Sequence, residues 1–497
     1  MVRGSPPGRP RAAVAAVGLI LAVGAPAAAQ PEPVPPPEPP TEAGPGPTED
    51  DDLGPVIEIE AIEIVGNVAT ADRIIRRALP FSVGDAVHAG AAELRAAKYK
   101  VLALGFFHEV DLAMRRGSAR GRVVVRVVVV ERGTVALNRL WFGSSSSSVA
   151  WFGLDLSERN LVGTGLTLGG GAIYALDRGV SGGRDQRAAE LRLGAPSLLG
   201  TRLSAFGTIS SQHGSEPYRV AGALDDDDLT NFQAFPYWRL GARGGAGYDV
   251  SALTRLSAAV RLEAIGAAVP IAPTRVTSDG AVIGVPLHLR PGRSDVVAIA
   301  LGFDRDTRPD PVLPHEGDRA QVQLELGSTL LGGDYDYAAL LGRYDRWWPR
   351  RDGTHAVGLR LTGGLILGDA PRFERLHLGD VNRMVTPRAL GLAVATGNAP
   401  GFLGTRSPDD PTGEVGGSAM VEYVARLFRG GKRVFGGDLF VGGGLWMLAD
   451  RVDLRVRDAH GWDALPIDLV LDAGLRVDTE LGVFELTLAN ALGRVPL

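Results

Sequence analysis

The stretch ALGFDRDTRPDPVLPHEGDRAQVQLELG, from Ala300 to Gly327, decides the fold. Before its charged centre, apolar residues occupy every second position from Val297 to Phe303, and the same spacing returns from Ala320 to Leu326. This alternation predicts two strands, each with one apolar face, and the prolines between them predict a tight irregular turn. A soluble sandwich would alternate as well. Here the second face is mostly glycine, alanine, glutamine and acidic residues, which is typical of a barrel with lipid outside and water inside.

The charged centre of this stretch also raises the question of a metal or acid/base site. It contains the candidate residues Asp304, Asp306, Asp310, His315 and Glu316. The alternative is a turn whose charges lie in water. Strand patterns flank the segment on both sides and favour a turn. The whole-chain pattern and the family resemblance given below lead us to expect a turn without a metal or a catalytic role.

The composition excludes several kinds of site. Among 497 residues there is no cysteine, which rules out disulfides, thiolate metal sites and a cysteine nucleophile. The net charge of -5 gives no support for nucleic-acid binding. The 67 glycines are roughly twice the usual ~7% and fit many turns and small lumen-facing residues.

The first 55 residues predict an exported protein with a tether. Three arginines precede an apolar run from Ala12 to Gly24, followed by APAAAQ. This order is typical of a secretory signal peptide over residues 1–29, cut after Ala29; an anchoring helix is the alternative. Residues 30–55 are proline-rich and acidic, so we expect a solvated linker.

Residues 56–132 predict a small α/β domain of order β-α-α-β-β. A strand ends at Gly66, and Thr70 is the expected N-cap of a first helix through Leu79. A second helix is expected from His88 to Leu104. The segments FFHEVDLAM and RVVVRVVVVE then predict two paired strands.

This segment resembles a polypeptide-transport-associated (POTRA) domain of the BamA/TamA-like outer-membrane assembly family; a generic α/β module would share only the element order. The matching residues are Gly66, Asn67, Gly84, Asp85, Gly105, Phe106 and Phe107. The resemblance implies a periplasmic domain that receives unfolded polypeptide, partly by adding strands at a sheet edge.

Residues 133–497 predict a transmembrane antiparallel β-barrel. Fifteen strands can be counted, beginning near Ala136, Val149, Leu166, Arg187, Arg202, Tyr237, Leu253, Val296, Ala320, Tyr335, His355, Ala419, Phe435, Asp468 and Val483. Short turns alternate with long loops at 213–232, 267–294, 367–414 and 449–466, as in bacterial outer-membrane barrels. This topology places Asp304 to Gly317 in the periplasm and Asp225 to Asp228 outside.

The barrel also resembles that of the same family, through GLDLSERNLVGTG, FDRDTRPDPVLPHEG, LLGGDYDY and GLRVDTELGVFELTLA. The family pattern has about sixteen strands, one more than can be counted. A miscount, parallel closure of an odd barrel, and a missing or vestigial last strand are the alternatives. We expect the last of these.

The resemblance further implies an ion pair inside the barrel. The loop RFERLHLGDVNRMVTPRALG matches a family loop that folds back into the lumen, and Arg388 takes the place of its arginine. Ala389 and Leu390 replace the family's glycine and aromatic residue. Glu422 matches the acidic wall residue, so Arg388 is expected to pair with it, and Arg383 competes for the same carboxylate. A buried guanidinium requires such a partner.

No catalytic motif accompanies these features, and we expect neither a cofactor nor a metal. Asp225 to Asp228 are more consistent with a solvated loop than with a cation site. The resemblance implies an outer-membrane assembly, insertion or polypeptide-translocation factor without enzymatic activity, in contact with lipid, an unfolded client and periplasmic partner proteins. A secretion pore of the two-partner type, a barrel lipase and a passive porin are the alternatives.

Overall fold

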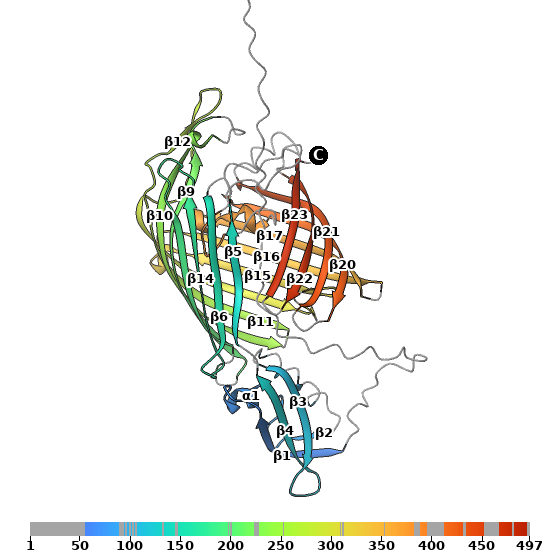
Figure 1. Cartoon of the computed structure of the whole chain (residues 1–497). Coiled ribbons are helices and arrows are strands. Elements are labelled where there is room, and N and C mark those ends of the chain that lie inside the picture. Colours follow the sequence, from blue (N-terminus) through green and yellow to red (C-terminus); the bar gives the residue numbers. More distant parts are fainter. Residues whose placement is uncertain are drawn as a thin grey trace, which may run out of the picture.

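The computed structural model describes residues 55–88, 94, 97–98, 101, 104, 107–131, 134–144, 148–196, 198, 201–222, 228–251, 253–308, 310, 313–351, 353–381, 388–394, 412–430, 434–451, 467–479 and 482–494. They form a small α/β unit and a large sheet curved into a barrel, with the α/β unit beyond one end of the barrel (Figure 1). The expected signal peptide and all but the last residue of the expected linker lie outside the described residues. Within the described part of the chain, no helix has the length and apolar character needed to span a membrane.

The N-terminal α/β unit has its own sheet and its own core. The sheet has the order β2-β1-β4-β3, with β1 parallel to β4 and the other pairs antiparallel. Its elements are β1 (Val56–Val65), α1 (Asp72–Ala78), β2 (Ala86–His88), β3 (Phe107–Arg116) and β4 (Arg122–Glu131). Alternate valines of β4 are buried with Ile59, Ile75 and Phe107 in one hydrophobic cluster. The predicted pairing of the last two strands is confirmed.

Two local predictions for this unit are wrong. Ala71, and not Thr70, is the N-cap of α1, and it makes no side-chain capping bond. Thr70 instead accepts a hydrogen bond from the side chain of Asn160 in the barrel. The expected second helix does not begin at His88, which belongs to β2. Of the rest of that segment Leu94, Ala97, Lys98 and Val101 are described as helical, and Leu104, its expected last residue, lies in a turn.

Among the described residues the barrel sheet contains fifteen strands, each paired with its neighbours along the chain. They are β5 (Val135–Gly143), β6 (Ser148–Leu161), β7 (Leu166–Asp177), β8 (Gln186–Ala195), β9 (Leu203–Arg219), β10 (Phe232–Ser251), β11 (Thr254–Ala267), β14 (Gly292–Asp306), β15 (Gly317–Gly327), β16 (Tyr337–Arg350), β17 (His355–Gly368), β20 (Val415–Arg429), β21 (Val434–Ala449), β22 (Ile467–Thr479) and β23 (Gly482–Arg494). The predicted count of fifteen strands is thus confirmed for the part of the chain that the structure describes.

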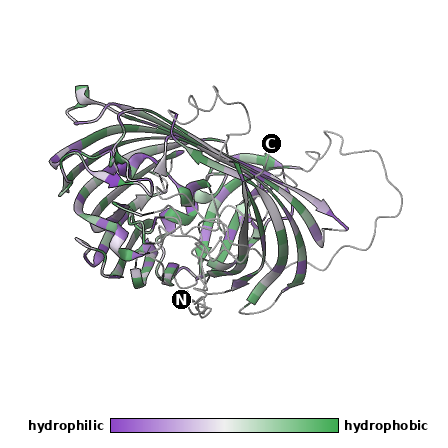
Figure 2. Cartoon of the chain, turned by 90° about the horizontal axis from the view of Figure 1, so that it is seen from above, coloured by the Kyte–Doolittle hydropathy of each residue, from purple (hydrophilic) through white to green (hydrophobic). Residues whose placement is uncertain are grey.

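The barrel wall is apolar outside and polar inside. On β10, Leu240 is 55% exposed on the outer face, whereas the adjacent Arg239 is only 6% exposed on the inner face. A water-soluble protein would bury the leucine and expose the arginine. The reverse order is what a lipid-facing wall requires. Figure 2 looks along the barrel and shows hydrophobic residues distributed around the wall.

The two ends of the barrel differ in their connections. Most strands meet through short turns at the end that carries the α/β unit, and the segment 307–316 between β14 and β15 lies at this end, while Asp304 and Asp306 belong to β14 itself. The opposite end holds the longer connections, which include Asp228 and a small hairpin of β12 (Thr274–Val276) and β13 (Val282–Gly284). The expected loop at 213–232 is shorter than predicted, because β9 continues to Arg219. Residues 225–227 lie outside the described residues.

Candidate functional site in the barrel lumen and at its seam

After β17 the chain folds into the lumen. We call the described residues 370–381 and 388–394 the plug; they include the 3-10 helix η4 (Arg372–Glu374), β18 (Leu376–His377) and α3 (Leu378–Val381). Strand β18 pairs with β19 (Thr412–Gly413). The plug shares one hydrophobic cluster with the inner wall, to which it contributes the buried residues Ala370, Phe373, Leu376, Leu378, Val381, Ala389, Leu392 and Val394.

Wall glycines make room for this packing. A Cβ atom on Gly364 would lie 2.5 Å from Cδ2 of Leu376, and one on Gly416 would lie 3.1 Å from Cγ1 of Val381. At the first distance the leucine would have to move, and the second is tighter than most carbon contacts. The absence of side chains at these positions therefore lets the plug sit against β17 and β20.

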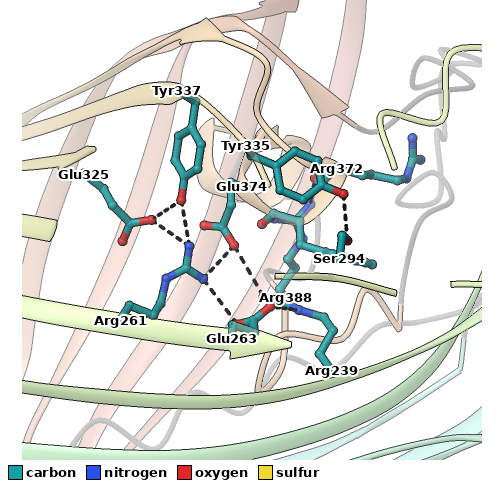
Figure 3. Close-up of polar contacts among 11 residues, drawn as sticks. Arg239, Arg261, Glu263, Ser294, Glu325, Tyr335, Tyr337, Arg372, Glu374 and Arg388 are labelled. Atoms are coloured by element: carbon teal, nitrogen blue, oxygen red, sulfur yellow. Dashed lines mark hydrogen bonds and ion pairs between the residues drawn. The ribbon is translucent and has the colours of Figure 1, made fainter. Parts of the chain in front are cut away.

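A buried charge network joins the plug to the wall (Figure 3). Glu374 of the plug accepts hydrogen bonds from Arg261 at 2.8 Å and from Arg239 at 3.4 Å. Arg261 also reaches Glu325 at 2.7 Å, and Arg239 reaches Glu263 at 2.6 Å. Because each buried charge has an opposite partner, the network stabilises one position of the plug.

Further contacts strengthen the same attachment. Phe373 contacts two wall residues: the ring centroid of Tyr237 is 4.5 Å away, and the guanidinium of Arg239 lies 4.4 Å from the Phe373 ring. Arg372 donates to Glu216 of β9 at 2.6 Å, and both side chains are 3% exposed. Buried pairs of this kind are costly to break on one side only. The plug is therefore attached by packing and by charge.

The expected pair of Arg388 and Glu422 is not formed. Arg388 donates within the plug, to the carbonyl oxygens of Phe373 at 2.8 Å, Arg372 at 3.2 Å and Arg375 at 3.4 Å. It thus holds the turn that carries Glu374. Glu422 lies on the inner wall as expected, but its carboxylate receives two hydrogen bonds from Arg476, at 2.5 and 2.7 Å. The competitor Arg383 lies outside the described residues.

Arg476 is a wall residue that the sequence reasoning missed. It lies on β22, between Glu422 of β20 and Glu485 of β23, and donates to Glu485 at 2.8 Å. Its guanidinium stacks over the Phe440 ring at 4.0 Å. The one feature of the sequence that could have indicated its role is an arginine at an inward-facing position of a predicted strand. Its contacts attach the last strand, β23, to the wall behind it.

Strands β5 and β23 border the seam of the barrel (Figure 1). Each pairs on one side only, and no ladder joins them among the described strands. Since the sheet is antiparallel and has fifteen strands, its first and last strands run in the same direction. A strand placed between them would be antiparallel to both.

The charged turn at 304–317 is more ordered than the sequence reasoning expected. Asp304 pairs with Arg319 at 2.8 Å, Asp306 with Arg308 at 2.7 Å and Asp310 with Arg429 of β20 at 2.9 Å. His315 is buried, and its Nε2 lies 3.0 Å from Oδ2 of Asp438 on β21. Among the described residues, no group of three or more His, Asp or Glu is placed to hold a metal ion.

In the α/β unit, the described residues of the expected motif shape turns. Gly66 has a φ of 96°, and a Cβ atom there would lie 2.0 Å from the carbonyl oxygen of Val129. The Asn67 side chain donates to the Thr70 carbonyl at 2.9 Å, and Asp85 accepts from the Ser82 amide at 2.7 Å. Gly84 has a φ of 93°, and Phe107 is buried in the core. Gly105 and Phe106 lie outside the described residues.

The segment 68–71 connects the α/β unit to the barrel turn that follows β6. Asn160 donates to the Thr70 hydroxyl at 2.8 Å, and the Ala71 amide donates to the Gly163 carbonyl at 3.1 Å. Glu131, at the end of β4, accepts from the amides of Ala69 and Thr70 at 2.8 and 2.6 Å. Partial burial raises the pKa of the Glu131 carboxyl, but these hydrogen bonds outweigh it and hold the pKa below its usual value.

Comparison with known proteins identifies the family. A model of the Omp85 superfamily domain matches residues 160–493. No curated protein matches the chain by sequence.

Solved structures share the fold at low sequence identity. BamA from Haemophilus ducreyi lacking POTRA domains 1–3 is 14% identical, with a TM-score of 0.57 over 88% of this chain and 82% of that one. CdiB from Acinetobacter baumannii is 11% identical, with a TM-score of 0.52 over 88% and 74% of the two chains. CdiB from Escherichia coli is 10% identical, with a TM-score of 0.52 over 90% and 88%. The family match spans more than half of the chain, so the protein belongs to the Omp85 superfamily and is an outer-membrane protein.

Proposed function

We propose that this protein inserts client β-barrel proteins into the outer membrane by offering the open edges of its seam to a client strand. Residues 1–29 act as a signal peptide and 30–55 as a linker, residues 56–132 form a periplasmic POTRA domain, and 133–497 form the barrel. The protein acts without catalysis. Its partners are the surrounding lipid and an unfolded polypeptide.

The outer edges of β5 and β23, which pair with no other described strand, carry this proposal. Backbone N–H and C=O groups that face lipid without a hydrogen-bond partner cost several kcal/mol each. A strand between the two edges would satisfy both of them with antiparallel ladders, whereas direct closure would require a parallel one. The seam therefore favours an added strand.

The plug supports insertion at the seam over passage through the lumen. A polypeptide that crosses the lumen must displace the plug and separate Glu374 from Arg261, and Arg372 from Glu216. Breaking one buried pair typically costs about 3–5 kcal/mol. Entry at the seam breaks neither pair.

The α/β unit has an edge that suits a client. Strand β3 borders the sheet and has no partner on its outer side among the described strands. Exposed strand edges bind extended peptides through main-chain hydrogen bonds. The contact between segment 68–71 and the turn after β6 keeps this unit close to β6, which pairs with β5 at the seam.

A locked plug tests the proposal. The variant Gly364→Cys/Leu376→Cys places two thiols where the Gly364 position faces Leu376, and the chain has no other cysteine. Oxidised and reduced forms would be reconstituted in liposomes with an unfolded outer-membrane barrel protein, and client folding followed by heat-modifiable migration. We expect equal folding rates in both forms.

A secretion pore predicts another outcome. If transport uses the lumen, oxidation should stop client passage and reduction should restore it. Loss of client folding on oxidation, with recovery on reduction, would overturn insertion at the seam.

A further inference from the structure

The outer face of β16 carries an unusual row of residues where the strand approaches the end that bears the α/β unit. Alternation places Tyr344, Arg346, Trp348 and Arg350 on this outward face, while Trp347 points inward and is 3% exposed. Two aromatic and two cationic side chains thus replace the aliphatic residues found farther along the strand. Such a mixture is typical of the boundary between lipid and water.

Among the described residues, Arg350 at the end of this row and Arg351, which follows it, have no acidic partner. The only acceptor of the Arg350 guanidinium among the described residues is the carbonyl of Pro349, at 3.2 Å. The exposed Arg351 follows in the turn, and no described carboxylate pairs with it. By contrast, Arg346 lies 3.4 Å from Asp318, which also faces Arg305. The positive charge at the rim therefore exceeds the negative charge of the described residues there.

The neighbouring strands β17 and β20 hold the end of β16 in place. His355 of β17 is the cross-strand partner of Arg350. Its Nδ1 lies 2.8 Å from the hydroxyl of Tyr423 on β20, and the two rings stack with centroids 5.6 Å apart. Trp348 and Arg350 therefore lie beside this ordered pair of rings, at the end of the membrane-facing wall.

We propose that Arg350 and Arg351, with Trp348 beside them, bind the phosphate of an anionic glycerophospholipid in the leaflet on the side of the α/β unit. Guanidinium groups match phosphate oxygens in charge and in fork geometry. The indole of Trp348 lies against the acyl–glycerol boundary, while the arginines extend to the headgroup. The site is separate from the seam and does not depend on the insertion activity.

Native mass spectrometry of the full chain in detergent tests this site. Phosphatidylglycerol and phosphatidylcholine with the same acyl chains would be titrated against the protein and against Arg350→Gln/Arg351→Gln. We expect the wild type to prefer phosphatidylglycerol, and the double variant to lose about thirty-fold of its affinity for that lipid, from two arginines near a headgroup. Arg293→Gln serves as the control. Arg293 lies at the start of β14, at the end of the barrel away from the α/β unit, and its side chain is 70% exposed, so this variant should keep the preference.

Other results would overturn the assignment. A double variant that binds phosphatidylglycerol like the wild type, while both migrate as folded barrels, would place the lipid elsewhere. If inorganic phosphate alone binds with the same dependence on the two arginines and phosphatidylglycerol binds no more tightly, the ligand is free phosphate and not a lipid. Equal binding of the two lipids by the wild type would show that the rim does not recognise the headgroup.

Discussion

Replacing Glu374 by glutamine removes the carboxylate that joins the plug to two arginines of the wall. Glu374→Gln keeps the size of the side chain, so the packing of Phe373 beside it is preserved. Arg261 and Arg239 then lose their contacts of 2.8 and 3.4 Å with a charged acceptor. The substitution therefore tests how much the charge contributes to the seating of the plug.

The size of the effect follows from the remaining partners. Breaking a buried pair typically costs about 3–5 kcal/mol. Here Arg261 keeps Glu325 and Arg239 keeps Glu263, so we expect a smaller cost than this, about 2–3 kcal/mol. That change corresponds to a roughly 30- to 150-fold larger population with the plug displaced.

The reactivity of a single cysteine measures the population of molecules with the plug displaced. Ala389 lies in the plug and is 1% exposed, so a thiol in Ala389→Cys reacts with a maleimide only when the plug moves. We expect the labelling rate to rise by the same 30- to 150-fold when Glu374→Gln is added. Asp279→Cys, in the exposed β12–β13 turn, should label at the same rate in both backgrounds. An unchanged rate at Ala389→Cys would refute a charge-held plug.

Three further substitutions test the attachments around the barrel. Glu131→Gln should reduce hydrogen-exchange protection in segment 68–71. Because the folded pKa of Glu131 is depressed, its stabilisation is present above the unfolded pKa of about 4.3 and is lost as the pH falls through the folded value. Gly163→Ala should loosen the same segment, since its Cβ would lie 1.8 Å from the carbonyl oxygen of Ala69 at a φ of 69°; exchange in segment 68–71 measures this as well. Arg476→Gln leaves Glu422 buried without that cation, so the barrel should lose about 3–5 kcal/mol and unfold at lower temperature in heat-modifiable migration.

For each of these three substitutions, one outcome would contradict the expectation. Protection of segment 68–71 that does not change with Glu131→Gln, after correction for intrinsic exchange, would mean that this carboxylate does not hold the segment. Normal exchange in Gly163→Ala would contradict the close approach of the two backbones. A wild-type melting temperature for Arg476→Gln would contradict its role in attaching β23.

The strands could be predicted because the pattern that specifies each strand lies within its own residues. Alternation of apolar and small or polar residues marks each barrel strand, and all fifteen appear in the expected order. The residues at which a strand ends depend also on the neighbouring strand. The sequence predicts a loop over residues 213–219, but β9 continues through them because pairing with β10 extends the ladder beyond the alternating pattern.

The partners of charged residues could not be predicted in the same way. The inward position of Glu422 follows from alternation, but its contact with Arg476 depends on how β20 and β22 lie on either side of β21. Arg388 bonds to backbone carbonyls, whose positions arise only when the plug folds. Likewise, the burial of His315 depends on Asp438, more than a hundred residues away along the chain.

Photo-crosslinking of a client during insertion tests the role of the seam most directly. A photoreactive residue would be placed at Leu140 of β5, at Leu488 of β23, or at Arg343, which is exposed on the inner face of β16. With an unfolded barrel protein arrested during insertion, we predict adducts at Leu140 and Leu488 and none at Arg343. Adducts at Arg343 without adducts at either seam strand would contradict the account, because the client would then pass through the lumen.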